Sequence, residues 1–441
     1  MGSWTFFASL LAINIVMHLL RLPKLILENG GGAFLILFVI TIHIVALPVI
    51  LAEISLMRSL KKIGFKNLLT FKKASSRSRW VLPITMSLGY LQLTMLLLLV
   101  IFLLFMVSLT VMHAVYYGRL TLGSSVLVAR PDLYPPLGYS IIGVISLILL
   151  QYIVVKKYIR RFIRISTRLI LPLCFAVFVV VFVKILLSIT GYEGLKALFY
   201  PDFSQLNRKS LLLSVGHVLV CMFVSLNFFN SRLFIENKRD PVRVVIHGII
   251  QSMIVALFIG VFALPMVQQT SDISFGASWI FDMLPRWLSY SHYGYYYCFL
   301  FYSSMSFILF YLSVICLRNS IFPVKSLVST SVNFLETKIV FFCGIAVLAG
   351  TLVFYGQSLR TWWGRSLFVT MDNIYVNWML PGLACATVWL MFNYTNKKQR
   401  EELFHKQQVF FHSTYFFRVW EYVAKYVVTG VVVSAIILFL L

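Results

Sequence analysis

The chain alternates long apolar runs with short polar connections. Eleven apolar segments can be drawn, at about residues 4–22, 33–57, 80–112, 137–155, 169–190, 210–231, 244–267, 293–317, 339–356, 371–393 and 419–441. Several of them exceed the roughly 20 residues that a helix needs to cross a bilayer. This pattern predicts an all-α polytopic membrane protein with about eleven transmembrane helices. No connection is long enough to form a separate soluble domain, so residues 1–441 are interpreted as a single transmembrane domain.

The positive charges are distributed unevenly among the connections. The chain carries a formal net charge of +24. With the N-terminus taken as cytoplasmic, the cytoplasmic connections hold 26 Lys and Arg residues and the opposite ones hold 8. This bias follows the positive-inside rule and predicts a cytoplasmic N-terminus. We therefore attribute the basic excess to topology and to contact with anionic lipid head groups in the bilayer, and expect no nucleic-acid partner. The short outer connections favour a bacterial inner membrane.

The residues give no indication of a disulfide framework, a metal site or an enzyme. The six cysteines lie in or near apolar segments without CxxC spacing, so neither a disulfide framework nor a metal site is indicated. No HExxH, GxSxG or Walker motif is present, and the chain has only 14 acidic residues. The sequence therefore predicts a protein that is not an enzyme and that has no cofactor.

Polar side chains inside the apolar segments are costly and require a reason. Asn14 and His18 are four residues apart, and so lie on one face of the first predicted helix. His217 and Cys221 show the same spacing in the sixth. The eighth predicted helix carries a hydroxyl face of Ser303, Ser304 and Ser306. Each residue alone is more typical of a hydrogen bond between helices, but three polar stripes together favour a central cavity.

Charged residues near the outer ends of two segments form a candidate pair. Arg21 lies near the outer end of the first segment, and Asp372 lies at the outer end of the tenth. Alone, Arg21 is interpreted as extending its guanidinium to the interface. If both residues face one vestibule, they can form a charge-assisted pair that opens and closes.

Several stretches resemble one known family. RLPKLILENGGGAF, residues 21–34, resembles the hallmark of the sodium:neurotransmitter symporter family. The likeness continues in LPVILAEISLMRS, with Glu53 at the position of the family's acid, and in YIRRFIRISTRLILPLCF. GLKALFYPDFSQL and TMDNIYVNW also match family elements, before the sixth and at the start of the tenth predicted helix. The resemblance covers nearly the whole chain.

The resemblance implies a leucine-transporter-type fold with two inverted repeats of five helices. The repeats fall at about residues 4–190 and 210–393, with an extra helix at 419–441. In this fold the first and sixth helices are broken midway, where backbone groups bind substrate and sodium. The resemblance implies an external gate of Arg21 and Asp372, with His217 as a polar neighbour. The positions that it implies for substrate binding are Asn14, His18, Val220, Phe223 and Ser303.

The departures from the family pattern concern ion coupling. LAINIVMH, residues 11–18, lacks the glycines of the family's first helix break, so a break is disfavoured there. The resemblance implies that His18 and Cys221 replace sodium ligands and that Phe223 replaces a nearby serine. Because sodium prefers hard oxygen ligands, we expect sodium coupling to be weak or absent. The positions implied for ion coupling, including a degenerate sodium site, are His18, Cys221, Ser303 and Ser306. A subsidiary hypothesis replaces sodium by a proton on His18.

The sequence therefore leads to one main functional hypothesis and two alternatives. The main one is a secondary active transporter of amino acids, amines or related small organic solutes, working by alternating access. The first alternative is a sensor or scaffold that keeps the architecture without transport, and the second is uniport or exchange without ion coupling. The sequence points to no particular solute or oligomeric state.

Overall fold

The computed structural model describes most of the chain as helices joined by turns. The described residues are 3–62, 81–122, 158–187, 198–222, 241–267, 279–289, 293–327, 373–398, 400–401 and 413–440, with a few single positions between them. No strand occurs within these ranges. The first half contains α1 (Ser3–Glu28), α2 (Gly32–Thr41), η1 (Ile42–Ala46), α3 (Leu47–Lys62), α4 (Val81–Thr121), α6 (Ile159–Ile165), η4 (Ser166–Ile170) and α7 (Leu171–Leu186). The second half contains η5 (Phe203–Gln205), α9 (Ser210–Cys221), α11 (Pro241–Val267), η6 (Trp279–Met283), α12 (Leu284–Ser289), α13 (Gly294–Leu327), η7 (Asn373–Met379), α16 (Leu380–Tyr394), α18 (Ser413–Tyr422), η8 (Val423–Val427) and α19 (Val428–Leu440).

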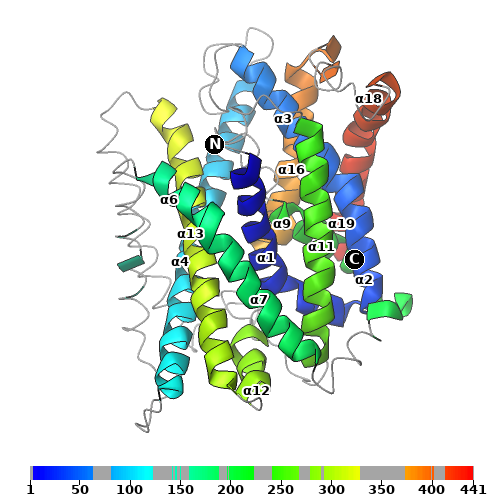
Figure 1. Cartoon of the computed structure of the whole chain (residues 1–441). Helices are drawn as coiled ribbons and strands as arrows, with labels where there is room; N and C mark the ends of the chain where they lie inside the picture. Colours follow the sequence, from blue (N-terminus) through cyan, green and yellow to red (C-terminus); the bar gives the residue numbers. More distant parts are fainter. Residues whose placement is uncertain are drawn as a thin grey trace.

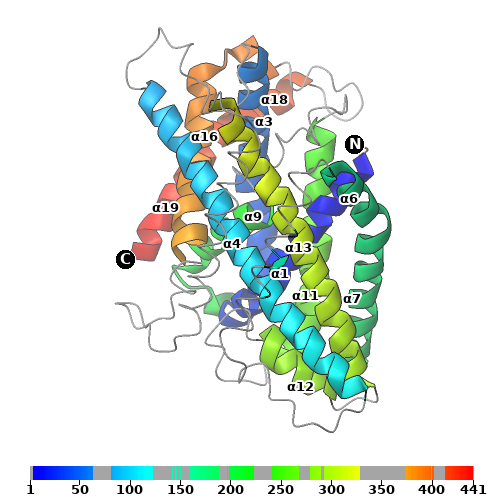
Figure 2. The ribbon, with the colours of Figure 1, turned by 90° about the vertical axis from the view of Figure 1, so that its left-hand side faces the viewer.

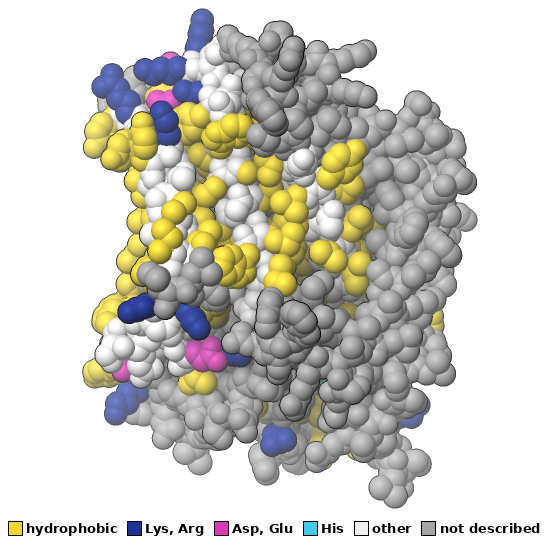
Figure 3. Space-filling model, turned by 180° about the vertical axis from the view of Figure 1, so that it is seen from behind, with side chains coloured by type: hydrophobic (Ala, Val, Ile, Leu, Met, Phe, Trp, Pro, Cys, Tyr) yellow, Lys and Arg dark blue, Asp and Glu magenta, His cyan; other side chains and the backbone are white. Residues whose placement is uncertain are grey.

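The helices have the length and composition of membrane spans. Eight described helical segments are long and apolar enough to cross a bilayer, and Ser210–Cys221 is a shorter apolar helix. On the face seen in Figure 3, the described Lys, Arg, Asp and Glu side chains gather toward the two ends, with a largely hydrophobic band between them. The prediction of an all-α integral membrane protein is confirmed. The predicted spans at 339–356 and, apart from four single positions, at 137–155 lie outside the described residues.

Helices α1 and α9 lie at the centre of the bundle. Helix α1 packs against α11, α9 and α13, and α9 also packs against α2 and η7 (Figure 1). Helices α4 and α13 run alongside each other and form the most extensive helix pair of the described chain (Figure 2). Residues from the two halves of the sequence therefore meet around α1, where the candidate polar side chains are located.

Helix α1 runs without a break through the segment that lacks glycine. It extends from Ser3 to Glu28 and includes the whole of residues 11–18. Because residues 11–18 contain no glycine, the sequence disfavoured the helix break that the family has at this point. The structure shows no break there. The predicted end near residue 22 is wrong, because α1 continues through Pro23 for more than a turn. A proline removes one hydrogen bond from the helix ladder, and a helix packed on several sides tolerates this loss.

Several of the prolines follow π-helical turns. Four of the five π-helical segments in the described chain, η1, η4, η6 and η7, each end two residues before a proline. These prolines are Pro48, Pro172, Pro285 and Pro381. A proline ring clashes with the carbonyl four residues earlier, and a wider turn relieves this clash. The π-helical turns therefore let the spans continue through their prolines.

The three consecutive glycines make a tight turn against a distant connection. Gly30 and Gly31 have φ angles of +79° and +63°, a region that glycine enters without steric cost. The Asp202 backbone N–H donates to the Gly30 carbonyl at 3.1 Å. Hydrogen bonds to the Asp202 carboxylate, first from the Ser204 hydroxyl, hold the pKa of that carboxyl below its usual value. The glycines thus bring the α1–α2 turn into contact with the chain that enters α9.

Gly30→Ala is expected to destabilise this turn. A Cβ at Gly30 would lie 2.0 Å from the Asp202 carbonyl oxygen, and the positive φ alone costs about 1–3 kcal/mol for a residue with a side chain. We expect a lower thermal unfolding temperature in detergent, measured by fluorescence-detected size exclusion after heating. Gly382→Ala is the matched control, because its Cβ would meet nothing within 4 Å. An equal effect of both substitutions would contradict the proposed role of the turn.

Candidate functional site

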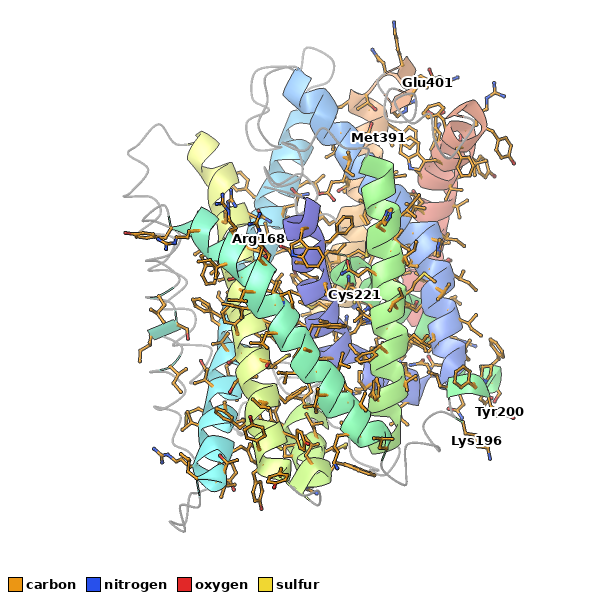
Figure 4. The ribbon with its side chains drawn as sticks, in the orientation of Figure 1. Arg168, Lys196, Tyr200, Cys221, Met391 and Glu401 are labelled. Carbon is orange, nitrogen blue, oxygen red and sulfur yellow. The ribbon has the colours of Figure 1, made fainter. Side chains whose placement is uncertain are left out.

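A cluster of nitrogen and sulfur side chains lies where α1 meets α9. His18 comes from α1, whereas His217 and Cys221 lie one turn apart on α9, and all three are completely buried. His18 Nδ1 is 3.1 Å from His217 Nε2 and 3.7 Å from Cys221 Sγ, and Cys221 Sγ is 3.6 Å from His217 Nε2. Figure 4 places Cys221 near the middle of the bundle. The cluster thus joins His18 from the polar stripe of the first predicted helix to both His217 and Cys221 from the stripe of the sixth.

Two further residues fix the histidine rings. His18 Nε2 is 3.1 Å from the Ser252 hydroxyl on α11, within hydrogen-bond distance. The Phe38 ring packs edge-on to His18 and tilted against His217, with ring centroids 5.4 and 5.6 Å apart. Because both His18 nitrogens have partners from other helices, its ring is fixed in orientation. Sequence reasoning missed Ser252, because nothing in a lone serine on an apolar helix identifies a partner 234 residues away.

Asn14 lies one helical turn before His18 on the same face of α1. Its side chain is completely buried, and neither its amide nitrogen nor its amide oxygen has a hydrogen-bond partner among the described residues. Leaving a buried polar group unpaired costs about 1–3 kcal/mol. An amide in this state is suited to bind a small polar molecule, and substrate binding by Asn14 stays a prediction from the family resemblance.

Arg21 contacts the start of the tenth predicted span. Its Nη2 donates to Asn377 Oδ1 at 3.4 Å, and the Asn377 amide donates to Asn373 Oδ1 at 2.8 Å. Gly216 permits this arrangement, because a Cβ there would lie 2.6 Å from the Val376 carbonyl oxygen and 2.8 Å from Asn377 Oδ1. Asn377 belongs to the TMDNIYVNW stretch but was not singled out. The predicted partner, Asp372, lies outside the described residues, directly before η7.

The other predicted site residues lie on α9, on α13 or outside the described residues. Val220 is buried beside Cys221 on α9. Ser303 and Ser306 lie on α13, where the Ser306 hydroxyl donates to the Ser303 carbonyl at 2.9 Å. Within the described part of the chain, neither serine hydrogen-bonds to the histidine cluster. Phe223 lies outside the described residues.

The cluster does not suit a sodium ion. Sodium prefers hard oxygen ligands, whereas the donors of the cluster are two imidazole nitrogens and one thiol sulfur. In addition, an unbroken α1 has its mid-helix carbonyls engaged in its own hydrogen-bond ladder. The residues present at this point therefore do not fit the ion that the family resemblance implies.

Comparison with solved structures assigns the helices to the leucine-transporter-type fold. One of the matching structures is the crystal structure of MhsT in complex with L-phenylalanine, with a TM-score of 0.80. It covers 100% of this chain and 98% of that chain at 14% sequence identity. The predicted fold is confirmed. No protein-family model matches the sequence, and no curated protein matches it either.

Proposed function

We propose that the protein is a secondary transporter that moves an amino acid or a related small organic solute by alternating access. The observation that carries the proposal is the unpaired, buried amide of Asn14 beside the His18 cluster, at the centre of a leucine-transporter-type fold. Buried polar groups without partners favour a ligand that supplies the missing hydrogen bonds. The ligand named for MhsT is L-phenylalanine, which supports an amino-acid-like solute here.

Arg21 is the proposed gate residue, together with Asp372 and His217. Arg21 already reaches η7, the element that begins directly after Asp372. His217 occupies the turn of α9 that follows Gly216, where α9 touches η7. A change in the separation of these elements would open or close the path from one side of the membrane.

His18 is the proposed coupling residue, with a proton in place of sodium. Its two ring nitrogens lie within hydrogen-bond distance of partners on two other helices, α9 and α11. A change in its protonation would therefore alter contacts among three helices at once. Sodium coupling is expected to be weak or lost, because the donors are soft.

Uptake into proteoliposomes tests the proposal. The purified chain would be supplied with a pooled, labelled amino-acid mixture under an imposed sodium gradient, an imposed proton gradient or neither. We expect concentrative uptake with the proton gradient and little additional uptake with sodium. His18→Asn is expected to remove the pH dependence, whereas His43→Asn, at an exposed histidine of η1, should keep it. Full pH dependence in His18→Asn would contradict proton coupling through this residue.

A non-transporting sensor or scaffold is the second candidate function. The unbroken α1 favours it, because a helix without a break lacks the usual backbone groups for substrate and ion. Saturable binding of a solute without uptake under any gradient would support this candidate and contradict transport.

A further inference from the structure

The three donor atoms of the His18 cluster have the spacing of metal ligands. Nδ1 of His18, Nε2 of His217 and Sγ of Cys221 form a triangle with edges of 3.1, 3.6 and 3.7 Å. A tetrahedral zinc ion has bonds of about 2.0–2.1 Å to nitrogen and about 2.3 Å to sulfur. These bonds place two nitrogens about 3.3 Å apart and a nitrogen and a sulfur about 3.6 Å apart. The observed triangle differs from this pattern by only a few tenths of an ångström.

The surroundings of the cluster resemble the outer shell of a metal site. Histidines that bind metals usually donate their second ring N–H to an acceptor, which fixes the tautomer. His18 has such an acceptor, because its Nε2 lies 3.1 Å from the Ser252 hydroxyl oxygen. With the proton on Nε2, the lone pair of Nδ1 is directed at the other two donors. The Phe38 ring covers both histidines and limits the access of water.

The two donors of α9 have a spacing that suits metal chelation. His217 and Cys221 are four residues apart and therefore lie on one face of the helix, as do the two histidines of the HExxH zinc motif. His18 supplies the third donor from α1. Within the described part of the chain, this is the only group of three His, Cys, Asp or Glu side chains close enough to hold an ion.

We propose that His18, His217 and Cys221 bind a Zn²⁺ ion with an open fourth position. Two imidazole nitrogens and a thiolate are the donors that zinc prefers, and three protein ligands with a free position are typical of sites where zinc meets a further ligand. Binding displaces the thiol proton of Cys221 to solvent, and no electron is transferred. The proposal concerns a metal site and does not depend on transport. A bound ion would occupy Nδ1 of His18, so the zinc-loaded chain is expected not to couple protons through this residue.

Metal content of the purified protein provides the first test. The full chain would be purified in detergent with a tag that contains no histidine, then incubated with Zn²⁺ and desalted. We expect about one zinc per chain by inductively coupled plasma mass spectrometry, and at least a tenfold weaker affinity in Cys221→Ala. Cys298→Ala is the matched control, because Cys298 is equally buried but lies on α13, away from the cluster. It should bind zinc as the wild-type chain does.

A spectroscopic test identifies the ligand atoms. Co²⁺ in place of Zn²⁺ should give tetrahedral visible bands and a thiolate-to-metal charge-transfer band. The charge-transfer band should be absent in Cys221→Ala and present in Cys298→Ala. Ser252→Ala, which removes only the acceptor for His18 Nε2, should weaken zinc binding by about 10–100-fold while keeping this band.

Defined outcomes would overturn the proposal. One is a wild-type chain that retains less than about 0.2 zinc per chain, and another is equal zinc in Cys221→Ala and Cys298→Ala. Stoichiometric binding of Cu⁺ under anaerobic conditions without binding of Zn²⁺ would also reject the zinc assignment. If Cys221→Ala does not fold, His18→Gln replaces it in the zinc measurement. Wild-type zinc content in His18→Gln, or no zinc-dependent rise in the unfolding temperature of the wild-type chain, would then overturn the proposal. Because none of these measurements uses uptake, a failure of transport and a failure of metal binding remain distinguishable.

Discussion

Gly216→Ala is expected to abolish solute uptake and to lower the stability of the folded protein. The new Cβ would lie 2.6 Å from the Val376 carbonyl oxygen and 2.8 Å from Asn377 Oδ1, so α9 and η7 must move apart. Overpacking of this kind costs about 1–3 kcal/mol. The separation would also displace Asn377 from Arg21 and His217 from His18, so the proposed gate and the cluster would both be misaligned.

Unfolding temperature and uptake by the same preparation would measure the effect of Gly216→Ala. Gly430→Ala in α19 is the matched control, because a Cβ there would meet nothing within 4 Å. The control should keep both properties of the wild-type chain. Wild-type uptake by Gly216→Ala would show that the close approach of α9 and η7 is not needed for function.

Arg21→Asp is expected to reduce uptake by at least tenfold, and Arg21→Asp combined with Asp372→Arg should restore part of it. The single variant loses the donor to Asn377 Oδ1 and, in the proposed pair with Asp372, replaces an attraction by a repulsion. Restoration by the exchanged pair would arise from the attraction between the two side chains, which does not depend on which helix carries the positive charge.

Lys24→Asp is the control for Arg21→Asp, because it makes the same change of charge on α1 at another position. Lys24, one turn further along, forms a 3.6 Å ion pair with Glu28 at positions i and i+4. Such partly exposed pairs contribute only about 0.3–0.5 kcal/mol. Lys24→Asp should therefore retain most of the uptake. If the exchanged pair transports no better than Arg21→Asp, the proposed partnership with Asp372 is wrong.

The sequence predicts the architecture better than it predicts the partners within the site. Apolar runs were enough to predict an all-α membrane protein, because hydropathy is a local property. The leucine-transporter type was implied by the resemblance of NGGGAF and other stretches to the symporter family. The spacing of Asn14 and His18, and of His217 and Cys221, placed each pair correctly on one helical face. The contact between His18 and His217, separated by 199 residues, depends on how two helices pack and left no local signal.

Helix ends were predicted less well than helix existence. Pro23 was expected near the end of the first span, yet α1 continues to Glu28. Pro48 and Pro172 likewise lie within continuous spans, each two residues after a π-helical turn. In lipid a helix that ends exposes backbone groups that cannot be paired, so these helices continue past their prolines, at Pro48 and Pro172 with a local widening of the helix.

Because α1 is a continuous helix, it is expected to move as one rigid element. Near one end, the Trp4 indole donates to the Thr167 carbonyl of η4 at 2.9 Å, and toward the other end Arg21 reaches η7. The 17 residue steps from Trp4 to Arg21 span about 25 Å of helix. A broken helix would absorb a tilt at its break, whereas α1 transmits it along its whole length. A displacement at Arg21 would therefore also move Trp4 relative to Thr167. In this way a single helix would couple the two ends of the bundle.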